Sequence, residues 1–286
     1  MQEIIFSKIH GAGNDFIVSD IPAGTGLPDL YSSEQFLRKI CDRCRGIGAD
    51  GIIFIEPMQE ERGSGAQSYR MYFFNNDGTR AGMCGNGLRC AALYAEKYLS
   101  EDDEGNFIFQ TDAGVLRTEK SGNNSFKIEI PLLKDAEMLQ INDNTVFFVN
   151  TGVPHLVVPI QNIDSIDVNK LGMGYRYHQS LAPAGANVDF IEITKKSEFI
   201  KIRTYERGVE AETKACGTGI AASAVVLVKF FDYPDEIRFR TFDNDEIQIA
   251  ISPTDSIVTE EKCIFLTGPA VEVFRGTYFP DNNQSR

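Results

Sequence analysis

Two cysteines far apart in the chain have nearly the same neighbours. Cys84 is followed by Gly-Asn-Gly and Cys216 by Gly-Thr-Gly, and each motif leads into a run of small and apolar residues. Such a run predicts a buried helix, and the glycines before it predict that each cysteine lies at a helix N-terminus. The repeat constrains the fold strongly, because it indicates two halves built on one plan.

The predicted elements repeat in the same order around these motifs. Each half has a strand, a glycine turn and a second strand, then a helical segment, expected at 33–43 in the first half and from about Asp164 in the second. A further strand leads to the cysteine, a helix follows it, and three strands with alternating apolar residues come last. The expected helices span 88–99 and 220–231, and the expected strands span 107–111, 115–119, 126–130, 237–242, 246–251 and 263–266, with turns at 112–114, 121–124, 243–245 and 252–255.

The sequence therefore predicts an α/β (α+β) chain of two pseudo-symmetric domains, each a curved, mainly antiparallel β-sheet or barrel around a central helix. The helix after Cys216 is apolar nearly all round, which requires that its own sheet enclose it. We expect one domain to comprise 1–131, completed by the tail 271–286, and the other to comprise 132–270. Pro131 and the polar residues after it indicate this boundary.

The composition narrows the function classes. The net charge is −13 and no run of basic residues occurs, which argues against a nucleic-acid partner. The longest apolar run, 220–228, is followed by Lys229 and is too short to cross a bilayer, and the first residues lack the pattern of an export signal. We therefore expect a cytoplasmic protein without a membrane partner.

The six cysteines are expected to be reduced thiols rather than a disulfide framework. Cys41 and Cys44 form a lone C-x-x-C pair, and a redox or metal role for it is disfavoured because no second pair completes a zinc site. Cys90 and Cys263 are interpreted as small core residues. The three histidines are scattered, so the sequence predicts no metal site.

Two thiols suit the inversion of a carbon that bears a hydrogen, because this reaction needs a base on one face and an acid on the other. A helix N-terminus favours the thiolate, so one cysteine can be ionised while the other keeps its proton. The backbone N–H groups of the two glycine motifs are also suited to hold a carboxylate from both sides.

Polar residues just before each cysteine indicate an amino-acid substrate. Glu206 and Arg207 precede Cys216 and are suited to bind an ammonium and a carboxylate, although a surface ion pair is an equally good interpretation. The corresponding stretch in the first half begins with Asn75. His155 follows Gly-Val-Pro in a turn and is interpreted as a pKa-setting neighbour of a thiol, with a structural histidine as the alternative.

Taken together, these motifs resemble the diaminopimelate epimerase family over nearly the whole chain. The resemblance is carried by the segments 8–16, 46–51, 74–78, 83–90, 205–208, 215–219 and 266–270. It implies a homodimeric enzyme that needs no cofactor and converts L,L-diaminopimelate to meso-diaminopimelate, for lysine or peptidoglycan precursor synthesis. It also implies a fold of two similar halves with the site between them.

The same resemblance assigns roles to individual residues. Cys84 and Cys216 are implied to be the acid–base pair, with His155 and Glu206 placed to tune them. Backbone N–H groups are implied to bind the α-carboxylate, namely those of Gly85, Asn86, Gly217 and Thr218. Side chains are implied to bind the rest of the substrate, mainly its distal end, namely those of Asn14, Asn75, Asn187, Arg207 and Glu206.

Two positions depart from the family pattern. Val153 stands where many members have Asn, and Gly51 stands where many have Gln, so contacts to the distal end of the substrate are expected to differ. A proline or hydroxyproline racemase of the same superfamily is disfavoured, because Asn86 stands where those enzymes typically have His. A thiol oxidoreductase that pairs Cys84 with Cys216, and a non-catalytic amino-acid-binding module, are the alternatives from other classes.

Overall fold

The chain forms two compact units in a computed structural model that describes residues 3–58, 67–100, 105–141, 143–195, 198–252 and 263–280. Unit 1 comprises Met1–Ile128 together with Pro269–Arg286, and unit 2 comprises Glu129–Gly268. The predicted turn at 252–255 lies mostly outside the described residues. Each unit is described by itself below.

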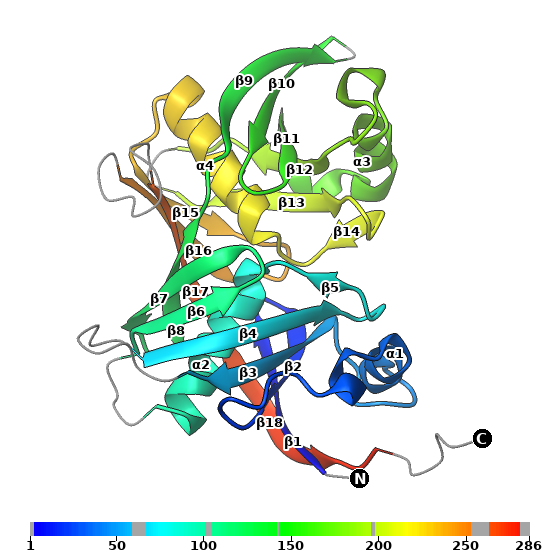
Figure 1. The fold of residues 1–286 in the computed structure, drawn as a ribbon. Coiled ribbons are helices and arrows are strands. Elements are labelled where there is room, and N and C mark those ends of the chain that lie inside the picture. Colours follow the sequence, from blue (N-terminus) through cyan, green and yellow to red (C-terminus); the bar gives the residue numbers. More distant parts are fainter. Residues whose placement is uncertain are drawn as a thin grey trace. The chain divides into compact units, whose positions relative to one another are not determined.

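The strands of unit 1 form one mainly antiparallel sheet in the order β18-β1-β2-β3-β4-β6-β7-β8, with only the pairs β2–β3 and β4–β6 parallel. The strand β18, which comes from the far end of the chain, pairs with β1 (Figure 1). The short strand β5 adds a hairpin to β4. The strands are β1 (Ile4–Gly11), β2 (Asn14–Asp20), β3 (Gly51–Pro57), β4 (Gln67–Asn75), β5 (Arg80–Ala81), β6 (Phe107–Thr111), β7 (Gly114–Gly122), β8 (Ser125–Ile130) and β18 (Val271–Tyr278).

Unit 2 repeats this arrangement strand for strand. Its order is β9-β10-β11-β12-β13-β15-β16-β17, again with two parallel pairs, β11–β12 and β13–β15, and with β14 as a hairpin on β13. The two units are therefore two copies of one topology, as the repeated motif predicted. The strands are β9 (Lys134–Ile141), β10 (Asn144–Asn150), β11 (Pro154–Ile160), β12 (Asn187–Glu192), β13 (Ile200–Glu206), β14 (Ala211–Thr213), β15 (Glu236–Arg240), β16 (Glu246–Ser252) and β17 (Cys263–Pro269).

One long helix lies at the centre of each unit, α2 (Gly85–Tyr98) in unit 1 and α4 (Gly217–Phe231) in unit 2 (Figure 1). Helix α2 contacts both β1 and β7, which are five places apart in the strand order. A flat sheet would separate two such strands by about 24 Å, more than twice the width of a helix. The sheet of unit 1 therefore curves around α2, and the contacts of α4 with β9 and β16 give the same result for unit 2.

Both sheets remain open, so the sheet form of the prediction holds and the barrel form does not. Among the described residues, β18 is not paired with β8, nor is β9 paired with β17. The inner face is apolar, and the first eleven residues of α2 are all buried. No helix in the described part of the chain is long and apolar enough to cross a membrane.

Shorter helices connect the parallel strands. Helix α1 (Glu34–Cys41) begins after the N-cap residue Ser33, and its end falls two residues before the predicted one. Helix α3 (Val168–Arg176) begins four residues later than predicted, because the Asp167 side chain accepts a hydrogen bond from the Lys170 N–H and caps it there. The short 3-10 helices are η1 (Asp29–Ser32), η2 (Ile163–Ser165) and η3 (Gln179–Leu181).

Candidate active site

Cys84 is the N-cap residue of α2, with an extended backbone (φ −142°, ψ 121°). The N–H of Gly87 donates a hydrogen bond to Cys84 Sγ over 3.4 Å, and the thiol is half-buried. The first N–H groups of a helix have no acceptor within the helix, which here applies to Gly85 and Asn86. A carboxylate at this end would receive hydrogen bonds and would be favoured by the helix dipole.

Asn14 lies beside Cys84, and its side-chain amide is held from both ends. Its Oδ1 accepts a hydrogen bond from Asn86 Nδ2 over 3.2 Å and lies 3.8 Å from Cys84 Sγ. Its Nδ2 donates to Asp50 Oδ2 over 2.8 Å. The structure thus brings together three of the predicted site residues of unit 1.

A cluster of charges stands behind Asn14. Arg43 binds both carboxylate oxygens of Asp15, at 3.0 and 2.7 Å, and also Asp50 Oδ1 at 2.8 Å, while Lys8 Nζ lies 2.7 Å from Asp15. Burial alone would raise the pKa of Asp15, but hydrogen bonds from Arg43 and Lys8 hold it well below its usual range. Because Asp50 Oδ2 accepts from Asn14 Nδ2, the other end of that amide, Oδ1, faces the cysteine.

Arg89, on the first turns of α2, is completely buried. Its Nη2 donates to Asn86 Oδ1 over 2.9 Å, and its Nε donates to the Pro269 carbonyl over 3.3 Å. Since Asn86 Oδ1 receives this bond, Asn86 Nδ2 is the atom that faces Asn14. A buried arginine therefore orients the amide next to the cysteine.

Cys216 occupies the corresponding position in unit 2, as the N-cap residue of α4. It is 8 % exposed, and its Sγ lies 3.4 Å from Thr218 Oγ1. Burial raises the pKa of the Cys216 thiol well above its usual value, and the negative charges of Glu206 and Asp189 raise it further. The sequence predicted one ionised and one protonated thiol without saying which, and burial makes Cys216 the thiol with the raised pKa.

Glu206 ends β13, and its carboxyl group lies close enough to Cys216 to raise the pKa of that thiol. Thr213 Oγ1 also donates to Glu206 Oε1 over 2.5 Å. Burial raises the pKa of Glu206, and the hydrogen bond from Thr213 offsets part of that shift. The carboxyl group is therefore a proton acceptor or donor adjacent to the sulfur.

His155, near the start of β11, is completely buried and does not contact the sulfur directly. Its Nε2 lies 2.9 Å from Thr218 Oγ1, the same hydroxyl that lies beside Cys216. Its Nδ1 lies 2.7 Å from Asp189 Oδ2, and Thr204 Oγ1 donates to the other oxygen of Asp189 over 2.8 Å. Unit 2 thus joins the predicted residues His155, Thr218 and Cys216 in one chain of hydrogen bonds that ends at an aspartate.

The side chains predicted to bind the distal end of the substrate lie at strand ends. Asn187 starts β12, and its Oδ1 accepts the backbone N–H of Arg207 over 2.8 Å. Arg207 makes no ion pair with any described residue. Asn75 ends β4 and donates from Nδ2 to Thr79 Oγ1 over 3.0 Å, so it is not in the hydrogen-bonded group around Asn14.

Gly51, one of the two departures from the family pattern, is tightly enclosed. A Cβ at this position would lie 2.6 Å from the Phe74 carbonyl oxygen and 2.9 Å from the ring of Phe73. In this chain the buried Phe73 ring occupies the space that a larger side chain at residue 51 would need. The other departure, Val153, is half-buried in the turn before β11.

Sequence reasoning did not single out Asp50, Asp189, Thr204 or Thr151. Asp189 lies in a strand among apolar residues, and a lone acid in such a strand gives no periodic signal. Thr151 Oγ1 donates to the Thr218 carbonyl over 2.9 Å and ties the first turn of α4 to the turn before β11. The available signal was position: Asp50 lies directly before β3, and Asn187 begins the matching strand β12.

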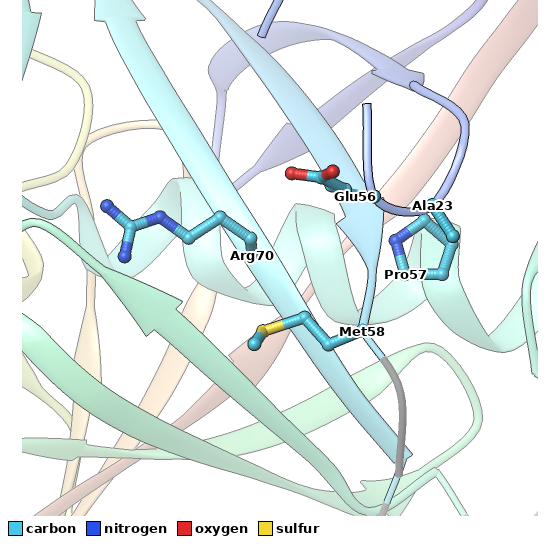
Figure 2. A pocket seen from close by; sticks show the side chains of 6 residues that line it. Ala23, Glu56, Pro57, Met58 and Arg70 are labelled. Carbon is cyan, nitrogen blue, oxygen red and sulfur yellow. The ribbon is translucent and has the colours of Figure 1, made fainter. Parts of the chain in front are cut away.

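A pocket of about 330 Å³ elsewhere in unit 1 contains none of the predicted site residues (Figure 2). Its charged lining residues already have partners: Glu56 accepts from the Gly26 N–H and the Tyr72 hydroxyl, and Arg70 pairs with Asp112. Among the described residues, no group of three or more His, Cys, Asp or Glu side chains is arranged to hold a metal ion.

Comparison with known proteins identifies the chain by its sequence. A family model described as diaminopimelate epimerase matches residues 6–130 and 147–272. A diaminopimelate epimerase from Aquifex aeolicus is 37% identical over 284 residues, which cover 95% of this chain and 96% of the relative. A diaminopimelate epimerase from a Hydrogenobaculum species is 35% identical and covers 96% of this chain and 98% of the relative.

Solved structures share the fold at low sequence identity. A PhzF-family phenazine biosynthesis protein from Bacillus anthracis superposes with a TM-score of 0.71 at 15% identity, covering 98% of this chain and 100% of that one. A probable proline racemase from Agrobacterium radiobacter superposes with a TM-score of 0.68 at 14% identity, covering 99% and 94%.

The doubled sheet-and-helix fold and the family match define an isomerase that epimerises a small molecule. More narrowly, the chain belongs to the diaminopimelate epimerase family.

Proposed function

We propose that this protein converts L,L-diaminopimelate to meso-diaminopimelate without a cofactor, with Cys84 and Cys216 as the two acid–base groups. The observation that carries the proposal is the repeated placement of a cysteine at the N-cap of the buried helix in each unit. A single thiol would explain a nucleophile or a redox residue. Two thiols in matched positions fit a reaction that removes a proton from one face of a carbon and adds one to the other.

The electrostatic surroundings suggest how the two thiols divide the work. Burial and nearby carboxylates raise the pKa of Cys216, so this residue starts as the proton donor. At Cys84 the Gly87 N–H donates to the sulfur, a bond that favours a thiolate and hence a base. In the reverse reaction the two roles exchange, and Glu206 beside Cys216 is placed to accept the proton that this thiol must then lose.

The first turns of α2 and α4 are the proposed binding site of the substrate α-carboxylate. The N–H groups of Gly85, Asn86, Gly217 and Thr218 lie in these first turns, where the helix itself supplies no acceptor. When the α-proton leaves, negative charge builds up on this carboxylate, and the same N–H groups stabilise it more strongly than in the ground state.

The distal end of diaminopimelate is itself an amino acid, which explains the need for further charged and amide groups. Arg207 offers a guanidinium without an ion-pair partner among the described residues, suited to a carboxylate. Asn14, Asn75 and Asn187 offer amide groups that both donate and accept. We propose that these four side chains select the substrate by its distal stereocentre.

Two further proposals concern the cellular setting. The six cysteines are free, which fits a reducing compartment such as the cytoplasm. There the product would enter lysine or peptidoglycan precursor synthesis, and no nucleic acid would be bound.

We also propose a homodimer, supported by large apolar side chains exposed on β1 and β18, with Ile5 at 47%, Val273 at 59% and Phe274 at 47% exposure. Light scattering that gives the 31.8 kDa chain mass rather than twice that value would refute the dimer.

The test of the catalytic proposal uses the purified, reduced protein with a chelator and without added cofactor. We expect conversion of L,L-diaminopimelate to the meso isomer, and a loss of kcat by at least about 10³-fold in both Cys84→Ala and Cys216→Ala. Cys44→Ala, at an exposed cysteine, is the matched control and should keep full activity. Activity that requires pyridoxal phosphate, or near-full activity in either of the first two variants, would refute the proposal.

A further inference from the structure

The carboxylate of Asp189 is fully buried in unit 2, at a fold position where unit 1 is apolar. The counterpart of Asp189 is Ile53, because Ile52 and Val188 belong to the equivalent core clusters beside α1 and α3, and the next residue of each strand faces the central helix. The strand register pairs Ile53 with Phe73 and Asp189 with Thr204. Both residues of the apolar pair are buried as well, Ile53 at 0% and Phe73 at 7% exposure.

Comparing the two units shows whether the fold itself requires a buried carboxylate at this position. Burying a carboxylate costs free energy unless hydrogen bonds compensate it. Unit 1 builds the same topology with Ile53 and Phe73 at these positions, so the fold does not require the polar pair of Asp189 and Thr204. A different reason must explain the buried aspartate.

The contacts of Asp189 point to His155. Both carboxylate oxygens act as acceptors, one for the Thr204 hydroxyl at 2.8 Å and one for the His155 ring at 2.7 Å. An ionised carboxylate only accepts hydrogen bonds, so the proton of the neutral ring sits on Nδ1 and Nε2 becomes an acceptor. The Thr218 hydroxyl then donates to Nε2 over 2.9 Å.

The direction of this chain extends to the sulfur. Once the Thr218 hydroxyl donates to His155, its oxygen can only accept from Cys216, whose Sγ lies 3.4 Å away. The S–H of Cys216 is thereby aimed along a fixed line. The other ionisable group facing this chain is Glu206, whose charge raises the pKa of the Cys216 thiol.

A close backbone contact holds Asp189 against the helix that carries the cysteine. A Cβ at Gly219 would lie 2.1 Å from Asp189 Oδ1, so glycine is the one residue that leaves room for the carboxylate at the first turn of α4. The corresponding Gly87 in unit 1 faces Ile53 and Phe16 instead. The second cysteine motif is thus shaped around Asp189.

We propose that Asp189 is a positioning residue for the proposed epimerisation, holding His155 in the Nδ1–H tautomer and so orienting the Cys216 S–H through Thr218. The proposal rests on the proposed function for its kinetic consequence, but the tautomer itself is measurable without substrate. It also explains why only one half of the doubled fold carries a buried histidine and aspartate at this place.

The experiment compares the Asp189→Asn variant with the unsubstituted parent protein, both as the full chain. Nitrogen NMR of 15N-histidine protein, with the His155 signals assigned by their loss in His155→Gln, should show protonated Nδ1 and unprotonated Nε2 in the parent protein. Asn can donate as well as accept, so we expect the variant to gain the Nε2–H tautomer. We expect kcat to fall by about 10²- to 10⁴-fold with KM changed by less than about threefold.

Two further variants keep the test decisive. Asp164→Asn removes the same charge at an exposed position of unit 2 and should change neither readout. Thr218→Val breaks the link to Cys216 while leaving Asp189 on His155, so kcat should fall while the tautomer stays. An unchanged tautomer in Asp189→Asn, or kcat within about threefold of the parent in either Asp189→Asn or Thr218→Val, would overturn the proposal. A parent protein without epimerase activity would instead refute the proposed function. In that case the tautomer measurement would still test the role of Asp189.

Discussion

Functional residues differ in how readily they can be recognised from the sequence alone. Cys84 and Cys216 stand out because each begins a glycine motif before an apolar run, a pattern that follows from the local geometry of a helix start. Asp189 carries no such mark, because its importance comes from partners on two other strands and a helix. Which of the two thiols has the raised pKa was equally out of reach, since burial is a property of the packed fold.

Glu206 should show its raised pKa in the stability of the protein. Because the folded state binds the Glu206 proton more tightly than the unfolded chain, this group stabilises the fold most below the ordinary carboxyl pKa. That contribution is lost as pH rises through the raised value. Glu206→Gln escapes this loss, so we expect its Tm to exceed that of the parent at neutral pH and the difference to vanish on acidification.

The same substitution should impair catalysis. Gln still accepts the bond from Thr213 but cannot exchange a proton with Cys216, so we expect kcat to fall by about 10²-fold. Thermal scans between pH 4 and pH 8 and steady-state kinetics would measure both effects, with Glu236→Gln at an exposed strand position as the control. A Tm advantage that grows on acidification would contradict the assignment.

Helices and strands were predicted well where one face is buried. The alternation of apolar residues located all six strands after the two cysteines, although β15 ends at Arg240, two residues before its predicted end. The central helices begin three residues earlier than predicted, because Gly85 and Gly217 join the first turn. Glycine has low helix propensity, so only the capping geometry reveals that these residues are helical.

Helix α4 provides a test of the contact between its first turn and Asp189. In Gly219→Ala the new Cβ would lie 2.1 Å from Asp189 Oδ1 and 2.8 Å from its Cγ. We expect a loss of about 1–3 kcal/mol in the free energy of unfolding, from overpacking and displacement of the buried carboxylate. Urea titration followed by circular dichroism would measure the loss.

Gly174, in helix α3 of the same unit, is the matched control. No atom lies within 4 Å of a Cβ at that position, so Gly174→Ala should be neutral or should stabilise the protein by up to about 1 kcal/mol. Equal effects of the two substitutions would mean that the close contact at Gly219 does not govern stability.

The whole chain illustrates what an internal repeat reveals and what it conceals. The doubled motif and the order of elements predicted two similar α/β units, and their matching strand orders follow from that repeat. The exposed C-terminal strand β18 pairs with β1 at the other end of the chain. The tail 271–286 was expected to complete the first domain, but the partner and register of its strand depend on contacts between distant segments, which no local pattern encodes.

The central claim is that two separate thiols handle the proton on the two faces of one carbon. The most direct measurement follows the α-hydrogen when protiated L,L-diaminopimelate reacts in deuterium oxide. The reaction is stopped when only a small fraction of the substrate has been converted. We predict that the meso product carries deuterium at the inverted carbon while the remaining substrate keeps its hydrogen, because the donor thiol was loaded from solvent. A product that retains the substrate's own hydrogen would show that a single group moves it across, and would contradict the account.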